Sequence, residues 1–282
     1  MNDVHPPLPA VREVVARALA EDLLPMGDVT GALIPVDVLV RGEIVSREEG
    51  VLAGRLSASE TFAQVDPAVV LSWSLDDGEE LEAGAHIATV EGSLPSVLSA
   101  ERTALNFLCH LSGVAAMTRR FVRAAAGHAR IRDTRKTTPG LRALEKAAVR
   151  AGGGVNHRGS LSDGILVKDN HLGGLSIEAA VRRARLRWPG RSVEVECDTQ
   201  AQVEAAVAVG TDLVLLDNMT PAEVGECVKL VDGRCLVEVS GGVNIQTVGE
   251  YADFGPDLIS VGAITHSAPI VDIGLDLPDV ES

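Results

Sequence analysis

The chain has only four lysines, and three of them lie in residues 133–171, a segment that also holds His157 and Arg158. Elsewhere arginine supplies the positive charge, so a lysine retained here is a candidate for chemistry. The segment is cationic within a chain of formal net charge -15. Such a local excess indicates a pocket for a small polyanion, whereas nucleic-acid binding would favour a broadly basic surface. The expected ligand carries phosphates, carboxylates or both. The three lysines are Lys136, Lys146 and Lys168.

Four cations of this segment are too many for one monoanion. They are Arg135, Lys136, Arg158 and Lys168. Arginine binds carboxylates through two parallel N–H groups, while lysine supplies a compact charge. His157 lies beside Arg158 and after three glycines, which favours a donor to an anionic ligand over an isolated structural histidine. The glycines could equally end the preceding helix.

Carboxylates follow the cations along the chain. Within residues 193–197 a period of two places Glu194 and Glu196 on one face and the apolar residues on the other. By the same period of two, Leu213, Leu215 and Asp217 share one face of residues 213–217, and Asp217 lies at the end of that face. One or two carboxylates together with substrate phosphates are the ligands that Mg²⁺ prefers, so Glu196 and Asp217 are candidate metal ligands. The alternative is that they are ordinary ion-pair partners of the arginines.

Small residues follow two later strands and favour phosphate binding. Glycines there let backbone N–H groups approach a phosphate closely, and a helix N-terminus adds a favourable dipole. Phosphate sites are common at the last loops of α/β barrels. Such glycines also cap turns, so the sequence alone leaves both interpretations open. The candidate residues are Ser240, Gly241, Gly242, Gly262 and Ala263.

Strands and helices alternate in the second half of the chain, which predicts a parallel sheet closed into an incomplete α/β barrel. The carboxyl ends of these strands carry the candidate residues, so we expect one active-site mouth there. The predicted strands are 131–134, 164–168, 193–197, 213–217, 236–240 and 258–262. The predicted helices between them are 141–151, 177–188, 200–209, 221–231 and 245–251.

The first half predicts a separate small α/β domain. Helices are expected at 9–23 and 56–65, strands at 39–46, 69–75 and 85–90, and a long linking helix within 95–127. We therefore predict an N-terminal domain over 1–110, including the start of the linking helix, and a catalytic barrel over 111–270. For the C-terminal tail, residues 271–282, one option is that the chain returns to the N-terminal domain.

Composition excludes several classes of function. Aromatic residues make up only 2% of the chain, which argues against base-stacking surfaces. The four cysteines form no C-x-x-C pair, and no apolar run is long enough for a membrane span. The N-terminus lacks the basic start and apolar run of a signal peptide. We therefore expect no nucleic-acid or membrane partner and a cytoplasmic location.

Motifs along nearly the whole chain resemble one family, the quinolinate phosphoribosyltransferases or carboxylating nicotinate-nucleotide pyrophosphorylases. The similar segments include EDLLPMGDVT, REEGVLAG and ERTALNFLCHLSG, then TRKTTPG, GGG-x-x-HR and K-D-N-H in that order, and finally VEVE, LLDNM, EVSGGVN and ISVGAITHSA. The resemblance implies an N-terminal open-faced α/β sandwich, a C-terminal α/β barrel of fewer than eight strands, and a homodimer whose subunits share active sites. Association of dimers into a higher oligomer is left open.

The resemblance also implies roles for individual residues. Quinolinate would be bound by Arg135, His157, Arg158 and Lys168, with Arg102 supplied by the partner subunit. Phosphoribosyl pyrophosphate and its Mg²⁺ would be bound by Lys136, Glu196, Asp217, Ser240, Gly241, Gly242, Gly262 and Ala263. Lys136, Glu196 and Asp217 would be catalytic, with the two carboxylates holding either the metal or the ribose hydroxyls.

The implied reaction transfers phosphoribosyl from phosphoribosyl pyrophosphate to quinolinate with loss of CO₂. It gives nicotinate mononucleotide and pyrophosphate for the synthesis of NAD. Three alternatives remain open at the level of sequence. They are a paralogue with another acceptor, such as the molybdenum-transport-associated proteins, a non-enzymatic sensor of phosphate ligands, and a lyase that uses Lys168 as a Schiff base.

Overall fold

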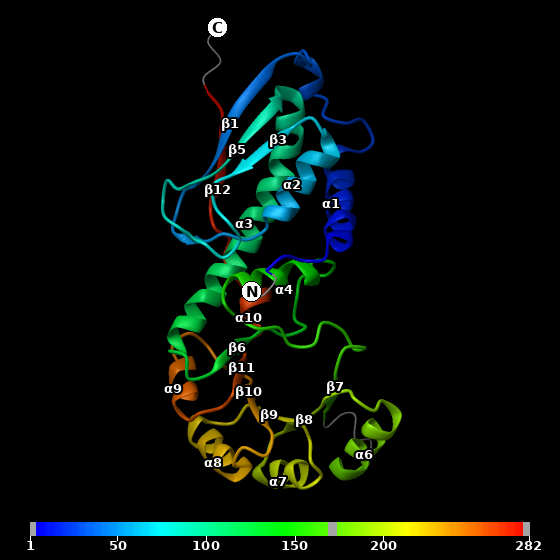
Figure 1. The fold of residues 1–282 in the computed structure, drawn as a ribbon, viewed down its shortest axis with the longest axis vertical. Coiled ribbons are helices and arrows are strands. Elements are labelled where there is room, and N and C mark those ends of the chain that lie inside the picture. Colours follow the sequence, from blue (N-terminus) through cyan, green and yellow to red (C-terminus); the bar gives the residue numbers. More distant parts are fainter. Residues whose placement is uncertain (1–3, 169–173, 279–282) are drawn as a thin grey trace. The chain divides into compact units, whose positions relative to one another are not determined.

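The computed structural model describes residues 4–168 and 174–278. Asp169, Asn170 and His171 of the K-D-N-H motif lie outside the described residues, as does the end of the predicted tail. The chain forms two compact units (Figure 1). Unit 1 comprises Met1–Arg119, Thr137–Gly153 and Ile264–Ser282, and unit 2 comprises Arg120–Lys136 and Gly154–Ala263. No helix among the described residues is long and apolar enough to cross a membrane.

Unit 1 contains a four-stranded antiparallel sheet with the order β12-β1-β5-β3. A second, two-stranded sheet pairs β2 with β4. The strands are β1 (Leu39–Ser46), β2 (Gly50–Val51), β3 (Val70–Trp73), β4 (Glu80–Leu81), β5 (His86–Ser93) and β12 (Ile273–Asp276). The helices are α1 (Leu8–Leu23), η1 (Gly31–Leu33), α2 (Arg55–Val65), α3 (Leu94–Ala124) and α4 (Arg142–Ala151).

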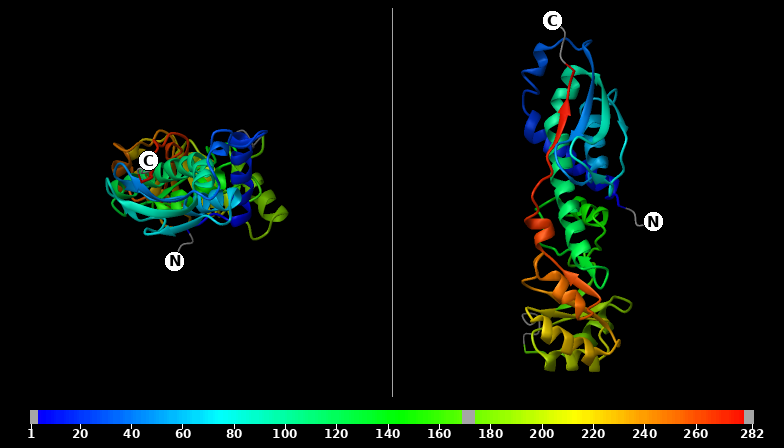
Figure 2. Two further views of the ribbon diagram at one scale, coloured as in Figure 1. Left: turned by 90° about the horizontal axis from the view of Figure 1, so that it is seen from above. Right: turned by 90° about the vertical axis from the view of Figure 1, so that its left-hand side faces the viewer.

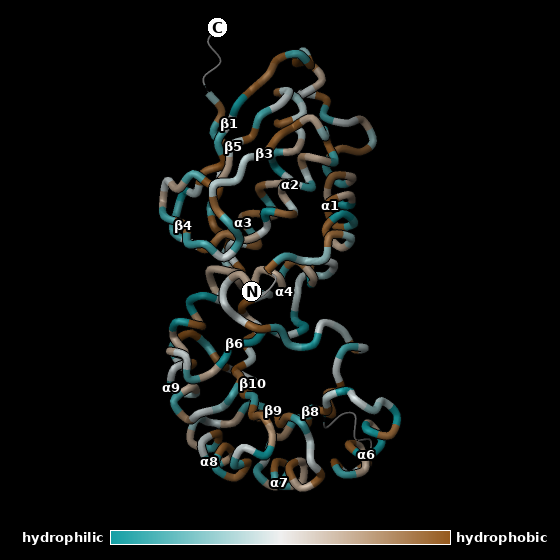
Figure 3. Tube along the Cα trace, viewed as in Figure 1, coloured by the Kyte–Doolittle hydropathy of each residue, from teal (hydrophilic) through white to brown (hydrophobic). Residues whose placement is uncertain are grey.

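The core of unit 1 lies between this sheet and the helices α2 and α3. Ile44 and Ile87 from the strands join Phe62 and Leu108 from the helices in one buried cluster. Each of these side chains is at most 1% exposed, and burial of one such side chain stabilises the fold by about 1.5–3 kcal/mol. Hydrophobic and hydrophilic residues are mixed along α1 (Figure 3), as expected for a helix with one buried face.

The C-terminal segment adds an edge strand to the sheet of unit 1. β12 pairs antiparallel with β1, and Leu275 lies opposite Ile44; both views show β12 running along β1 (Figures 1 and 2). The predicted domain boundary at residue 110 falls inside α3. Residues 137–153, expected in the barrel, cluster with unit 1 instead. The units are therefore interleaved in sequence, because a compact unit is defined by packing and not by chain order.

Unit 2 is built on a six-stranded parallel sheet with the order β6-β11-β10-β9-β8-β7. The strands are β6 (Arg130–Arg132), β7 (Ile165–Val167), β8 (Val193–Cys197), β9 (Leu213–Asp217), β10 (Leu236–Ser240) and β11 (Leu258–Ser260). The helices are α6 (Ile177–Arg187), α7 (Gln200–Ala208), α8 (Pro221–Val231) and α9 (Val248–Asp253), and α10 (Ala263–His266) follows at the border of the unit.

Among the described strands the barrel sheet is open between its two edge strands, β6 and β7. β7 to β11 follow one another in sequence, while β6 pairs with β11 at one edge and β7 lies at the other. Thr199 and Thr220 start α7 and α8 with complete capping boxes, which satisfy N–H groups that the first helical turn leaves unpaired. The predicted α/β fold class, with an antiparallel sheet and a parallel barrel sheet, is confirmed.

Candidate active site

The carboxyl ends of β7 and β8 bring a lysine and a glutamate together. β7 pairs in parallel with β8, with Val167 opposite Val195. Lys168 and Glu196 are therefore the next residues on adjacent strands, and their side chains form an ion pair. The Lys168 side chain is 38% exposed and that of Glu196 is 12% exposed. The pair thus lies at the edge of the barrel interior, where an anionic ligand could compete with Glu196 for the lysine.

His157 is buried against two carboxylates. Its Nε2 lies 3.3 Å from Glu194 Oε2 and 3.7 Å from Glu238 Oε1. Its Nδ1 accepts a hydrogen bond of 2.7 Å from the backbone N–H of Arg158. Because Nδ1 accepts, the proton of the ring lies on Nε2 and is directed at the glutamates. The predicted donation from His157 to a ligand stays a prediction.

Glu238 is the most deeply buried acid of this cluster. Its side chain is fully buried and forms an ion pair with Arg132, and it accepts a hydrogen bond from the Ser260 hydroxyl. Burial raises the pKa of Glu238, and the charge of Glu194 raises it further, while Arg132 and His157 act in the opposite direction. Buried charges are tolerated only when they are paired and hydrogen-bonded. Here Arg132 supplies the paired cation and the Ser260 hydroxyl supplies a hydrogen bond.

Arg135 and Arg158 act on one another electrostatically. Burial lowers the pKa of Arg158, and the positive charge of Arg135 lowers it further, while Glu194 and Glu196 oppose both effects. Arg158 also donates a hydrogen bond of 3.2 Å to the carbonyl of Gly164. Two cations held near each other gain from an anion between them. Lys136 follows Arg135 directly and is exposed.

The ends of β9 and β10 also meet. Ser240 is registered with Asp217, and the backbone N–H of Asn218 donates to the carbonyl of Ser240 at 2.9 Å. The Asn218 amide donates to Asp217 Oδ2 at 2.8 Å. Gly242 has a φ of +65° and open space where a side chain would begin, so its backbone can be approached closely. Gly262 and Ala263 lie where β11 leads into α10.

Replacement of Gly241 by alanine is expected to destabilise this turn. Gly241 has a φ of +89°, which side-chain-bearing residues rarely adopt, and an added Cβ would lie 2.2 Å from Asn218 Oδ1. We expect a loss of about 1–3 kcal/mol of unfolding free energy, measured by urea denaturation. Gly210→Ala is the matched control, since Gly210 also has a positive φ (+71°) but meets no neighbour within 4 Å. Equal losses in the two variants would contradict the proposed close contact with Asn218.

The described residues contain one cluster of three groups with metal-ligand spacing, formed by His157, Glu194 and Glu238. Its candidate ligand atoms lie within 4.8 Å of one another. A metal would need the Nε2 lone pair of His157, but that atom carries the proton. This cluster therefore does not fit a metal ion. The predicted ligands Glu196 and Asp217 lie on the adjacent strands β8 and β9, and Glu196 is registered with Leu215, two residues before Asp217.

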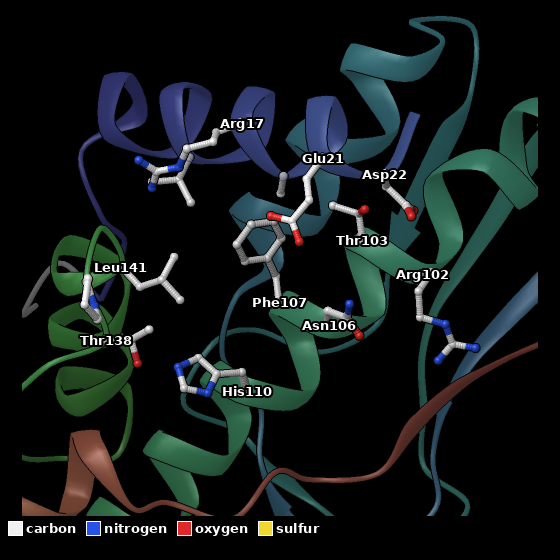
Figure 4. A pocket seen from close by; sticks show the side chains of 13 residues that line it. Arg17, Glu21, Asp22, Arg102, Thr103, Asn106, Phe107, His110, Thr138 and Leu141 are labelled. Carbon is white, nitrogen blue, oxygen red and sulfur yellow. The ribbon is translucent and has the colours of Figure 1, made fainter. Parts of the chain in front are cut away.

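Arg102 belongs to unit 1, whereas the other predicted quinolinate ligands belong to unit 2. It lines a pocket of about 380 Å³ formed by α1, α3 and the segment after Thr137. Figure 4 shows its guanidinium extending away from the other labelled side chains. The Arg102 side chain is 71% exposed, and its contact with Glu101 spans 4.0 Å, the outer limit of an ion pair.

Sequence reasoning missed the roles of Arg132 and Glu238. The signal was present, because a period of two along β10 (Leu236–Ser240) places Leu236, Glu238 and Ser240 on one face. Val237 and Val239 are buried on the other face, at 3% and 0% exposure. The same alternation that placed Glu194 and Glu196 therefore also places Glu238 in the barrel interior.

The antiparallel sheet of unit 1 and the charged strand ends of unit 2 define a two-unit α/β-barrel protein. Residues 28–112 match the model of the quinolinate phosphoribosyl transferase N-terminal domain, and residues 114–276 match that of the C-terminal domain. The chain belongs to the quinolinate phosphoribosyltransferase family.

Individual relatives match most of the chain. The nicotinate-nucleotide pyrophosphorylase (carboxylating) of Mycobacterium leprae is 45% identical over 278 residues, which cover 95% of this chain and 97% of the relative. The probable enzyme of this name from Bacillus subtilis is 40% identical, covering 89% of this chain and 88% of the relative. The solved structure of nicotinate-nucleotide pyrophosphorylase from Francisella tularensis superposes with a TM-score of 0.93 at 36% identity and covers 99% of both chains.

Proposed function

We propose that this protein transfers the phosphoribosyl group of phosphoribosyl pyrophosphate to quinolinate, with release of pyrophosphate and CO₂, to give nicotinate mononucleotide. The observation that carries the proposal is the match of residues 28–112 and 114–276 to the N-terminal and C-terminal domains of the family. The charges of unit 2 support it, since Arg135, Arg158 and Lys168 suit a dicarboxylate.

Fixed charges perform most of the proposed chemistry. Arg135 and Arg158 hold the quinolinate carboxylates. Lys168 gives up its ion pair with Glu196 and forms one with the ligand. Lys136 stabilises the negative charge that develops on the departing pyrophosphate, while Glu196 and Asp217 stabilise positive charge on the sugar. The pyridine nitrogen then bonds to the anomeric carbon. The positive charge on that nitrogen stabilises the electron pair left at the ring carbon when CO₂ departs, and a proton from water completes the product.

Mg²⁺ is the proposed cofactor. The donor set fits it, because Glu196 and Asp217 offer hard oxygen ligands at the ends of adjacent parallel strands. When bound, Mg²⁺ would neutralise pyrophosphate oxygens. Asp217 keeps one carboxylate oxygen for this role beside the one that accepts from Asn218, and Ser240, Gly241 and Gly242 supply the proposed phosphate-binding backbone.

A homodimer with shared sites is the proposed assembly. In it, Arg102 of one subunit would complete the quinolinate site of the other. The exposure of the Arg102 side chain and its weak contact with Glu101 support a partner outside its own subunit. We also propose a cytoplasmic location.

The function is tested by product formation from the purified protein, phosphoribosyl pyrophosphate and Mg²⁺. Quinolinate is supplied in one reaction and nicotinate in another, and nicotinate mononucleotide and CO₂ are measured. We expect product from quinolinate alone, and loss of turnover when a chelator is added, with recovery on addition of Mg²⁺. Product from nicotinate, or none from either acceptor, would contradict the proposed substrate. Full turnover in chelator would contradict only the metal.

A further inference from the structure

The segment Asn156–Arg158 carries two of the proposed quinolinate ligands but has no regular secondary structure. Its position must therefore come from specific contacts. One contact is made by the main chain of the preceding residue: Val155 donates to the carbonyl of Ile131 at 2.8 Å and accepts from the N–H of Asp133 at 3.2 Å. This bridge ties the start of the segment to β6, and side chains add further contacts to the next three residues.

Asp133 provides the first of these side-chain anchors. It is fully buried, and both of its carboxylate oxygens accept from the segment. Oδ1 accepts from the backbone N–H of His157 at 2.7 Å, and Oδ2 accepts from the Asn156 amide at 2.7 Å. Hydrogen bonds to a charged acceptor are roughly twice as strong as neutral ones. Asp133 thus holds two consecutive residues with one rigid group.

Glu238, on β10, provides the second anchor. Through its ion pair with Arg132 it fixes a guanidinium whose Nε donates to the carbonyl of Asn156 at 3.4 Å. The carboxylates of Glu238 and Glu194 also lie next to Nε2 of His157. The main chain and the imidazole of the segment are therefore held by one buried acid, and the adjacent Arg158 is carried by the same anchored backbone.

We propose that Asp133 and Glu238 are positioning residues for quinolinate, which hold the backbone of Asn156–Arg158 so that the guanidinium of Arg158 faces the substrate. The inference rests on the proposed function. Neither acid is required to touch the substrate. Because groups that orient binding residues affect the ligand bound by those residues, the effect of losing them falls on quinolinate and not on phosphoribosyl pyrophosphate.

The test compares the two substrates in Asp133→Asn and Glu238→Gln. In Asp133→Asn, the new NH₂ group would face one of the two groups that donate hydrogen bonds to Asp133. In Glu238→Gln, the negative charge that holds Arg132 would be lost. We expect the KM for quinolinate to rise about tenfold or more in each variant, as for loss of a hydrogen bond to a charged group. We expect the KM for phosphoribosyl pyrophosphate to change less than about threefold, on the same reasoning.

Two further variants keep the test decisive. Asn156→Ala removes one donor to Asp133 on a partly exposed segment, and we expect a smaller rise in the same KM even where Asp133→Asn does not fold. Glu204→Gln is the control, since Glu204 is an exposed acid on α7 of the same unit. A merely structural role would reduce the active fraction and hence kcat, with both KM values unchanged, and that result would overturn the inference. An inactive wild-type protein would instead overturn the proposed function.

Discussion

Lys136→Ala is expected to lose about 10²- to 10³-fold in kcat, the effect of removing one fixed charge that stabilises a developing anion. Lys136 is exposed, and its backbone N–H donates to Thr134 Oγ1 at 3.0 Å, a contact that alanine retains. We therefore expect the unfolding free energy to change by less than about 0.5 kcal/mol, as for most surface substitutions. The measurement is steady-state turnover of quinolinate, accompanied by thermal unfolding.

Lys136→Arg separates charge from shape. Arginine keeps the positive charge but replaces a compact ammonium by a planar fork, so we expect partial recovery of kcat. Lys229→Ala is the matched control, because Lys229 lies in the last turn of α8 and is the one lysine outside the motif-rich segment. Wild-type turnover in Lys136→Ala would remove this residue from the site, and equal losses in the control would show a general dependence on charge.

Three strands of unit 2 could be predicted to the residue. β8, β9 and β10 have the bounds expected from sequence, because runs such as VEVEC and LLD alternate or end abruptly at polar residues. β6 and β7 are shorter than predicted. Strand pairing decides those ends, and periodicity within a single strand carries no information about the length of its neighbour.

The site was less predictable than the strands that carry it. Arg135, Arg158 and Lys168 could be proposed from their types and spacing, but their partners depend on distant segments. Lys168 pairs with Glu196, 28 positions away, and Arg132 pairs with Glu238, 106 positions away. Lys146, which shares the motif-rich segment, is buried on α4 in unit 1. A cluster of cations in sequence therefore contains both ligand candidates and structural residues, and only packing separates them.

Arg102→Ala and Lys168→Ala subunits, each inactive alone, are expected to recover activity when mixed. If Arg102 acts on the partner's site, a mixed dimer has one site that carries both defects and one site that carries neither. Random exchange makes half of the dimers mixed, so the expected activity is about one quarter of wild type in a twofold-symmetric assembly. The measurement is quinolinate turnover after exchange of differently tagged subunits, with co-purification of the tags as proof that exchange occurred.

The matched control places both defects in the barrel. If each barrel supplies both Lys168 and Arg135 to the same site, every site in a mixture of Lys168→Ala and Arg135→Ala subunits carries one defect. This mixture should therefore be no more active than either variant alone. Thermal unfolding checks that Lys168→Ala, which leaves Glu196 without its ion-pair partner, still folds. Recovery in the first mixture and none in the second requires that Arg102 and Lys168 of one site come from different subunits. Absence of recovery in both, with exchange demonstrated, would place Arg102 in the site of its own subunit.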